Sequence, residues 1–420
     1  MPRVYTSARR FEGDALDAFC VLQKGFTDQF VYYDKETGTH LLGLGRCVAC
    51  PSMSDFEFTN QGDEDVAPIL FSFNRFDAEN PAPADSLFST FPRLRFMCPE
   101  IVIIEDERGC FLQVNSLGPV YAGRVERFVR HAQEAPHRSR VTVPYTVEGG
   151  DPVAWERQVA QAKDAFATDR IQKVVLSQQR RLQAAHPFSS KDLLVNLVDG
   201  DAVGTVFMYR YGDVFFCGCT PELLVRKRGN RVESMCLAGT IAAGANEEER
   251  AANAAALLND AKNRVEHEYV VEFLRQVMAR NCYDVEIPHE PGIRALRHVQ
   301  HLHTPVSACV LDGCSISDLA SQLHPTPALA GSPVGEAMMA LRRIEPYNRG
   351  FFGGAVGYVD GNGDGAFSVA IRSGVFDGEM GWLYAGCGVV EASVAADEFA
   401  EVDMKLKTIL SAFDGGETAE

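Results

Sequence analysis

The first 130 residues alternate short apolar runs with polar turns. Segments such as QFVYYD, THLLGLG, PILFSFNRF and EIVIIEDERGCFLQV are rich in β-branched, aliphatic and aromatic residues, which fit a pleated surface. We therefore expect residues 1–130 to form sheet. A polar, proline-containing connector follows at 131–151, and the spacing of the apolar residues then changes.

Residues 152–415 mix helical and strand-like patterns. AWERQVAQAKDAFATDR, a long segment at 247–280 and the closing DEFAEVDMKLKTILSAF have the apolar spacing of amphipathic helices. KVVLS, TVFMYRYGDVFFCG and LLVRKRGNRVESMCL have strand spacing, and three more strands joined by Gly/Asp turns follow RGFFGG. Hairpin-linked strands separated by long helices predict an α/β (α+β) fold with mostly antiparallel sheets.

The composition excludes several classes of function. The 420 residues include 40 Lys and Arg against 57 Asp and Glu, a formal charge of -17. This balance argues against nucleic-acid binding, which needs a basic surface. No apolar run is long enough to span a membrane and the N-terminus has no signal-like apolar segment, so we expect a cytoplasmic protein. An anionic substrate would have to be held by locally placed cations.

Lys173 stands at the mouth of the predicted strand KVVLS. A lysine in this position usually ends a strand as a solvated residue. The alternative is a reactive lysine. The fragment alone leaves both interpretations open.

Charged residues also lie beside the apolar stripes of the predicted helices. Glu266 shares a helix face with Val270 and Leu274, and a buried carboxylate needs a partner or a cation. In the closing helix, Glu398, Glu401 and Lys405 run along the edge of the stripe, where they could line a cleft. Glu401 and Lys405 are four residues apart, so they could instead form an exposed pair worth about 0.3 to 0.5 kcal/mol.

Arg372 closes the predicted strand FSVAIR. Strand alternation places it on the same face as Ser368 and Ala370, whose small side chains leave room for its guanidinium to bind a carboxylate. A solvated arginine is the alternative. The nearby DGNGDG at 360–365 resembles the start of a calcium loop, but Ile371 stands where the loop requires Glu, so we predict a hairpin turn.

Taken in order, nine motifs resemble those of the chorismate-binding enzyme family, which includes isochorismate, salicylate, anthranilate and aminodeoxychorismate synthases. They are KVVLS, GCTPELL, LAGT, VEHEYVV, LHPTPALAGSP, RGFFGGAVGY, FSVAIR, YAGCGVV and DEFAEVDMKLKTIL, within roughly residues 152–412. The resemblance implies two large, mostly antiparallel sheets packed as a sandwich with helices outside. Residues 1–130 would be a variable, sheet-forming part of that sandwich, 131–151 the connector and 152–415 the catalytic region.

The same resemblance implies a set of site residues and a Mg²⁺ cofactor. Glu266 and Glu401 match the family's metal carboxylates, Lys173 its base and Glu222 its general acid. The positions that match substrate-binding residues are Gly239, Thr240, His324, Ala328, Arg372, Gly386, Gly388 and Lys405.

These matches imply an isochorismate synthase, an isomerase that uses Mg²⁺ to convert chorismate reversibly to isochorismate. Neutral Lys173 would take a proton from the water that attacks C2, and protonated Glu222 would donate one to the departing C4 hydroxyl. Desolvation would favour both neutral forms. Salicylate synthases, which go on to eliminate pyruvate, are the close alternative, and the LHPTPA form disfavours them. Ammonia-using members typically have Gln in place of Lys173.

The resemblance also bears on partners. A binding-only relative is disfavoured, because the base, the acid and both metal carboxylates are present. Since the family's site is complete within one chain, we expect a monomer or weak homodimer with a small-molecule substrate. The sequence does not distinguish the menaquinone, siderophore and salicylate pathways that the product can feed.

Overall fold

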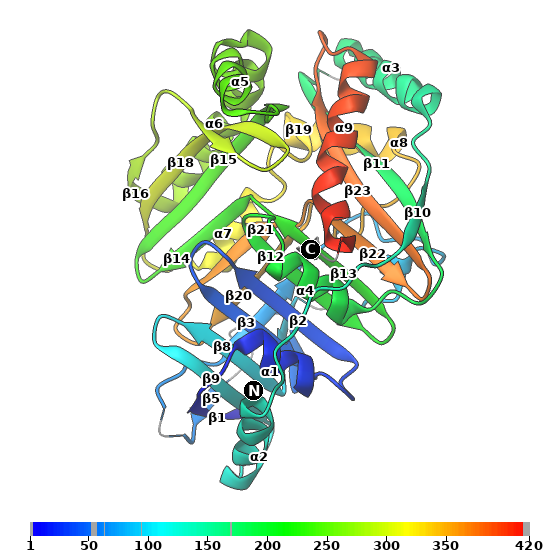
Figure 1. The fold of residues 1–420 in the computed structure, drawn as a ribbon. Coiled ribbons are helices and arrows are strands. Elements are labelled where there is room, and N and C mark those ends of the chain that lie inside the picture. Colours follow the sequence, from blue (N-terminus) through cyan, green and yellow to red (C-terminus); the bar gives the residue numbers. More distant parts are fainter. Residues whose placement is uncertain (1–2, 52–56, 63, 94, 169, 415–420) are drawn as a thin grey trace.

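Two large β-sheets pack face to face, and helices cover their outer sides (Figure 1). This architecture comes from a computed structural model that describes residues 3–51, 57–62, 64–93, 95–168 and 170–414. Within these ranges one sheet has 13 strands and the other has 10. The predicted α+β sandwich with mostly antiparallel sheets is therefore confirmed.

The first sheet runs in the order β10-β11-β23-β22-β13-β12-β2-β3-β8-β9-β1-β5, with β19 beside β11. Neighbouring strands are antiparallel except β1 and β5. Its strands are β1 (Arg3–Phe11), β2 (Asp28–Asp34), β3 (Thr39–Leu44), β5 (Glu57–Asn60), β8 (Ile101–Asp106), β9 (Gly109–Ser116), β10 (Tyr145–Glu148), β11 (Lys173–Ala184), β12 (Thr205–Tyr211), β13 (Val214–Thr220), β19 (Gly331–Ser332), β22 (Ser373–Asp377) and β23 (Met380–Val389).

The second sheet runs in the order β16-β18-β15-β14-β21-β20-β6-β7-β4, with β17 beside β18. Its strands are β4 (Val48–Cys50), β6 (Ile69–Phe73), β7 (Phe96–Cys98), β14 (Leu223–Arg228), β15 (Arg231–Ala242), β16 (Cys282–Glu286), β17 (Gly292–Ala295), β18 (Val299–Val310), β20 (Ala355–Asp360) and β21 (Gly365–Val369). The predicted hairpin turn at 360–365 is confirmed, because Asp360 Oδ1 accepts from the backbone N–H groups of Asn362 and Asp364 between β20 and β21.

Helices pack against the outer faces of both sheets, with α6 on β15 and α9 on β23. None of the helices in the described part of the chain is both long and apolar enough to cross a membrane. The helical elements are α1 (Ala15–Leu22), α2 (Ala122–Gln133), α3 (Pro152–Thr168), α4 (Ser190–Asp199), α5 (Glu247–Asn259), α6 (Ala261–Asn281), α7 (Ile316–Leu323), α8 (Val334–Ile344), α9 (Ala395–Leu410) and the short 3₁₀ turns η2 (Leu87–Ser89) and η3 (Ser411–Phe413).

The single helix predicted over 247–280 is two helices. Asp260 is extended and interrupts the helical backbone, and its carboxylate accepts the N–H of Asn263 at the start of α6. Aspartate favours such a cap over a helix interior because its short side chain satisfies a free backbone donor. The break allows α6 to take its own direction across β15, which positions Glu266.

Aromatic side chains from both sheets fill the space between them. The Phe30 ring on β2 stacks on Phe71 from β6 and on Tyr209 from β12, with centroids 5.6 and 5.1 Å apart. Phe351 packs against Tyr209 from the segment before β20. Offset aromatic contacts of this kind add to the burial of apolar area, and they fix how the two sheets face each other.

Strands from residues 1–130 extend both sheets. β2 pairs with β12 in the first sheet, and β6 pairs with β20 in the second. The expected end of the catalytic region, residue 415, lies outside the described residues. The chain therefore contributes both of its halves to each layer of the sandwich.

Candidate active site

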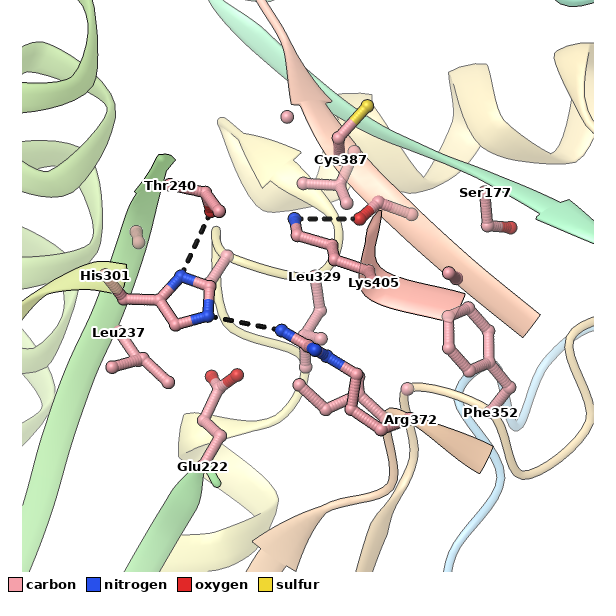
Figure 2. Close-up of a pocket in the computed structure, with 18 of the residues that line it drawn as sticks. Ser177, Glu222, Leu237, Thr240, His301, Leu329, Phe352, Arg372, Cys387 and Lys405 are labelled. Atoms are coloured by element: carbon pink, nitrogen blue, oxygen red, sulfur yellow. Dashed lines mark hydrogen bonds between the residues drawn. The ribbon is translucent and has the colours of Figure 1, made fainter. Parts of the chain in front are cut away.

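A cavity of about 740 Å³ lies between the two layers, bounded by β11 and β23 on one side and by β15, β18 and α6 on the other (Figure 2). Helix α9 and the segment after α7 close it. Nine of the residues predicted from the sequence line it: Glu222, Gly239, Thr240, Glu266, Ala328, Arg372, Gly386, Gly388 and Lys405.

Lys173 lies immediately behind the residues that line the cavity and is fully buried. It is the first residue of β11, and its Nζ is 2.9 Å from Glu266 Oε1. The contact meets the distance for an ion pair, although its angles leave the amine without a hydrogen-bond acceptor. The solvated strand-end interpretation of Lys173 is therefore wrong.

Gly388 makes this close approach possible. A β-carbon built there would overlap Glu266 Oε1 and come within 2.9 Å of Lys173 Cε. Any larger residue would have to displace one of the two charged groups. Gly388, the second glycine of YAGCGVV, is thus required because the side chains of Glu266 and Lys173 pass close to its backbone.

Glu266 projects from α6 toward the cavity, while Val270 and Leu274 on the same face are buried in the core. The predicted face of this helix is confirmed. Burial opposes ionisation of Glu266, but the charge of Lys173, helped by that of Lys405, holds its pKa below the ordinary value. Glu266 is an ionised carboxylate next to a cation.

Glu222 follows β13 and points into the cavity (Figure 2), with only 6% of its surface exposed. Burial raises its pKa to about 7, and the nearby charges of Lys405, Lys173 and Arg372 limit the rise. A carboxyl group in this condition holds a proton near neutral pH. It can therefore serve as a general acid.

A bulge in β15 brings two predicted residues to the cavity. The register between β15 and β18 shifts between Leu237 and Thr240, and Gly239 has φ +83° within the shift. Positive φ favours glycine, and a bulge redirects the side chains beside it. The backbone N–H of Thr240 is held by Asn263 Oδ1 at 3.1 Å.

Arg372 is part of a buried row with His301 and Thr240 (Figure 2). Its Nη2 donates to His301 Nε2 at 3.2 Å and its Nη1 to Thr408 Oγ1 at 2.8 Å. The arginine can only donate, so the proton of neutral His301 is on Nδ1, which donates to Thr240 Oγ1 at 3.0 Å. Burial and the charge of Arg372 hold the pKa of His301 well below its usual range. The Thr240 hydroxyl proton is thereby left to point toward the cavity.

The backbone at Arg372 differs from the sequence prediction. Strand β21 ends at Val369, and Arg372 has φ +53°, which is unusual for a residue with a β-carbon. Alternation along FSVAIR therefore does not place its side chain, and the predicted shared face with Ser368 and Ala370 is wrong. The guanidinium is 3% exposed, so a solvated arginine is also excluded. Burial lowers its pKa to about 10, which leaves it charged at neutral pH.

Helix α9 contributes two partly buried ion pairs on neighbouring turns. Lys405 Nζ lies 2.7 Å from Glu401 Oε1 and donates to the Gly386 carbonyl at 3.0 Å. One turn earlier, Glu398 is buried and pairs with Lys262 of α6 at 2.5 Å. Burial opposes the charge of Lys405, but the Glu401 carboxylate raises its pKa above the ordinary value. The exposed-pair interpretation of Glu401 and Lys405 is thus excluded.

The donor set suits a magnesium ion. Glu266, Glu398 and Glu401 all influence the Cys387 thiol electrostatically, so they gather at one end of the cavity, and a lysine balances each of them. Across the described ranges, no group of three or more His, Cys, Asp or Glu side chains is arranged to hold a metal alone. Mg²⁺ typically takes one or two carboxylates and completes its shell with water and substrate oxygens, so the residues fit.

A buried arginine connects two of the segments that line the cavity. Arg349 forms an ion pair with Glu345 at 2.6 Å and donates to the carbonyls of Leu329 and Val175 at 3.0 and 2.6 Å. Glu345 in turn accepts from the N–H and hydroxyl of Ser177. The arrangement ties β11 to the loop that carries Ala328.

His324 is the one predicted substrate-binding residue that the structure places away from the cavity. Its Nε2 donates to the carbonyl of Gly353 at 3.0 Å, and Gly353 itself lines the cavity. The ring faces a neighbouring cleft on the other side of that backbone. A Pro-stiffened loop in the sequence does not reveal which of its side chains turns inward.

Sequence reasoning missed three further groups at the site: His301, the Arg349–Glu345 pair and Lys262, the partner of Glu398. Each is charged or polar within an element whose pattern looks ordinary. VQHLHTP, for example, reads as an edge strand with two histidines. Only the pairing of β18 with the bulge in β15 brings His301 opposite Thr240. The closing helix did carry a signal, since Glu398 stands one turn before Glu401.

Comparisons with known proteins identify the family. A family model described as chorismate binding enzyme matches residues 12–414. Isochorismate synthase MenF of Bacillus subtilis is 34% identical over 360 residues, which are 83% of this chain and 75% of that protein. The salicylate biosynthesis isochorismate synthase of Pseudomonas aeruginosa is 39% identical over 290 residues, 67% of this chain and 60% of that protein.

Solved structures share the fold. The menaquinone-specific isochorismate synthase MenF of Escherichia coli has a TM-score of 0.79 at 22% identity, covering 99% of this chain and 95% of that one. Anthranilate synthase component I of Streptococcus pneumoniae has a TM-score of 0.68 at 22% identity, covering 84% and 82%.

Proposed function

Because this chain belongs to the chorismate-binding enzyme family, we propose that it is an isochorismate synthase, which converts chorismate to isochorismate. The names of its relatives support this reaction within the family. The observation that carries the proposal is the buried pair of reacting groups. Lys173 is fully buried beside Glu266, and Glu222 holds its proton near neutral pH because its pKa is about 7.

The cavity suits a dianionic substrate. Arg372 and Lys405 line it and remain charged at neutral pH, and Thr240 offers a hydroxyl proton. Carboxylates bind such groups by charge-assisted hydrogen bonds, which are stronger where water is excluded. A chain with a formal charge of -17 can therefore hold a substrate with two carboxylates at this one place.

In the proposed reaction, Lys173 and Glu222 move protons on the two sides of the ring. Lys173, once neutral, takes a proton from the water that attacks C2 as the ring double bonds shift. The C4–O bond breaks, and Glu222 gives its proton to the departing hydroxyl, which leaves as water. One water enters and one leaves, so the net change is an isomerisation. The burial of both groups keeps bulk water from competing.

Glu266 and Glu401 would hold Mg²⁺ at the carboxylate end of the cavity, with Glu398 beside them. When bound, the ion would supply positive charge for the ring carboxylate of the substrate. In its absence Lys173 and Lys405 neutralise the two carboxylates. We expect Mg²⁺ and substrate to bind together, because the charge of the ion and that of the dianion offset each other.

Product analysis tests the proposal directly. Purified protein, Mg²⁺ and chorismate should give isochorismate on HPLC, with no requirement for ammonium. If salicylate and pyruvate are the main products without an added lyase, the enzyme is a salicylate synthase. If turnover needs ammonium, it belongs with the anthranilate-type synthases.

A further inference from the structure

A second cleft opens beside the end of β6. Its volume is about 1220 Å³, and it shares no lining residue with the active-site cavity. Its walls include Phe73, Asn74, Arg75, Ala78 and Pro81, then Pro92, Arg93, Arg95 and Phe96, and residues of α7. Nothing in the proposed reaction uses it.

The charge of this cleft differs from that of the rest of the protein. Arg75, Arg93 and Arg95 line it, and none of its described lining residues is Asp or Glu. The chain as a whole carries 57 acidic residues and a formal charge of -17. A cleft with three guanidinium groups and no acid of its own is a local attractor for an anion.

Arg75 is the innermost of the three cations. Its Nη2 donates to the carbonyls of Phe88 and Phe91 at 2.7 and 3.1 Å, which fixes the side chain, while its buried Nη1 has no hydrogen-bond partner. Burial lowers the pKa of Arg75, and the charge of Arg93 lowers it further. The two cations repel each other, and a bound anion would relieve both that repulsion and the missing hydrogen bond.

The nearest acidic side chains are already engaged elsewhere. Asp77 forms a two-pronged pair with Arg342 at 2.7 and 2.8 Å. Asp318 accepts from the N–H and hydroxyl of Ser315 at the start of α7, and these hydrogen bonds, with a smaller contribution from Arg95, lower its pKa. Neither carboxylate lines the cleft.

Beside the polar Asn74, Ser317, Ser321 and His324, much of the remaining wall of the cleft is apolar. The apolar part includes the side chains of Phe73, Pro81, Pro92, Phe96, Phe351 and Phe367. A bare inorganic anion would leave these walls unused, whereas a flat ring with one acidic group would contact both kinds of surface. We propose that the cleft is a second binding site, which takes a small aromatic carboxylate with its carboxylate on Arg75 and Arg93.

The second cleft and the active-site cavity are neighbours, so the test needs variants that each alter only one of them. Phe351 lines the cleft, whereas its neighbours Phe352 and Gly353 line the active-site cavity. His324 lines the cleft and donates to the Gly353 carbonyl. Since the cavity also attracts carboxylates, affinity alone does not locate a ligand.

Benzoate is a suitable probe for isothermal titration calorimetry on the full-length protein. The Arg93→Gln, Arg95→Gln double variant removes two exposed cations of the cleft, and thermal unfolding checks that it folds. Arg372→Gln removes a cation of the cavity instead. Benzamide, the neutral isostere, and inorganic phosphate separate the contributions of charge and ring.

We expect saturable benzoate binding that weakens about tenfold or more in the double variant and changes less than about twofold in Arg372→Gln. Benzamide and phosphate should each bind about tenfold more weakly than benzoate. The chorismate KM of the double variant should stay at the wild-type value without benzoate. Three results would overturn the proposal: no saturation up to about 10 mM benzoate, loss of binding only in Arg372→Gln, or phosphate binding as tight as that of benzoate.

Discussion

The Nζ of Lys173 lies 2.9 Å from Oε1 of Glu266, and this contact joins the first sheet to the helix that covers the second. The carboxylate that we expect to hold Mg²⁺ is therefore the one that pairs with the proposed base. A Mg²⁺ ion held by Glu266 would share this carboxylate with Lys173, so we expect metal binding and the proton on the base to be linked.

Gly388→Ala should disable the site without unfolding the protein. The added methyl group would overlap Glu266 Oε1 and crowd Lys173 Cε, so the pair must separate. We expect kcat to fall about 100-fold or more, since small displacements of reacting groups have effects of this size. Steady-state kinetics would measure this, with Gly335→Ala as the control because its β-carbon meets nothing within 4 Å. Wild-type kcat in Gly388→Ala would mean that the pair tolerates displacement.

Lys173→Gln should abolish hydration while chorismate binding remains measurable. Gln is polar and only one atom shorter than Lys but cannot take a proton, and losing a general base typically slows a reaction by about 100- to 10,000-fold. Product formation by HPLC and chorismate binding by calorimetry would measure the two effects separately. Lys191→Gln changes an exposed lysine and serves as the control. Retained turnover in Lys173→Gln would remove Lys173 from the role of base.

Glu222→Gln should remove activity and also change how stability depends on pH. The carboxyl pKa rises from the ordinary 4.5 to about 7 in the folded protein, so folding favours the protonated form. The contribution of this group to the free energy of unfolding is fully present below pH 4.5 and is lost as the pH rises through 7. The loss amounts to about 3 kcal/mol.

Urea unfolding of the metal-free protein at pH 5 and pH 8 would measure this difference. The wild type should lose more stability between the two pH values than Glu222→Gln does. The rate of the wild-type enzyme should also fall as the pH rises above 7, because the acid is then deprotonated. Identical pH dependence of unfolding in both proteins would show that Glu222 titrates normally.

Glu401→Gln should raise the Mg²⁺ concentration needed for half-maximal activity by about tenfold or more. The amide keeps one oxygen but loses the negative charge that attracts the ion, and Lys405 loses the partner that raises its pKa. Activity titrated with Mg²⁺ would measure the change, and Glu391→Gln, at an exposed glutamate, is the matched control. An unchanged Mg²⁺ requirement would assign Glu401 to positioning Lys405 alone.

The sequence predicted those parts of the site that depend on local pattern. The helix face of Glu266 follows from the spacing of Val270 and Leu274. The remaining site residues were predicted from the resemblance of the ordered motifs to those of the family. Each of these patterns lies within a single helix, strand or motif, so it can be recognised in the sequence alone.

The errors have a different origin, because they depend on how elements meet. The break at Asp260 looks like one more polar residue in a helical pattern, and the end of β21 at Val369 cannot be seen from alternation. His324 turns away from the cavity because the Gly353 carbonyl captures its ring. His301 gains its partners only through the pairing of two strands about 60 residues apart.

The pairing of β2 with β12 and of β6 with β20 has a consequence for how the protein is made. A fragment beginning at residue 152 would present β12 and β20 as unprotected edges, which are templates for aggregation. Strand β11, which begins at Lys173, also gains its neighbour β23 only after residue 389 has been synthesised. No shorter part of the chain therefore forms the site by itself. A nascent chain on the ribosome stays inactive until nearly all of it has emerged.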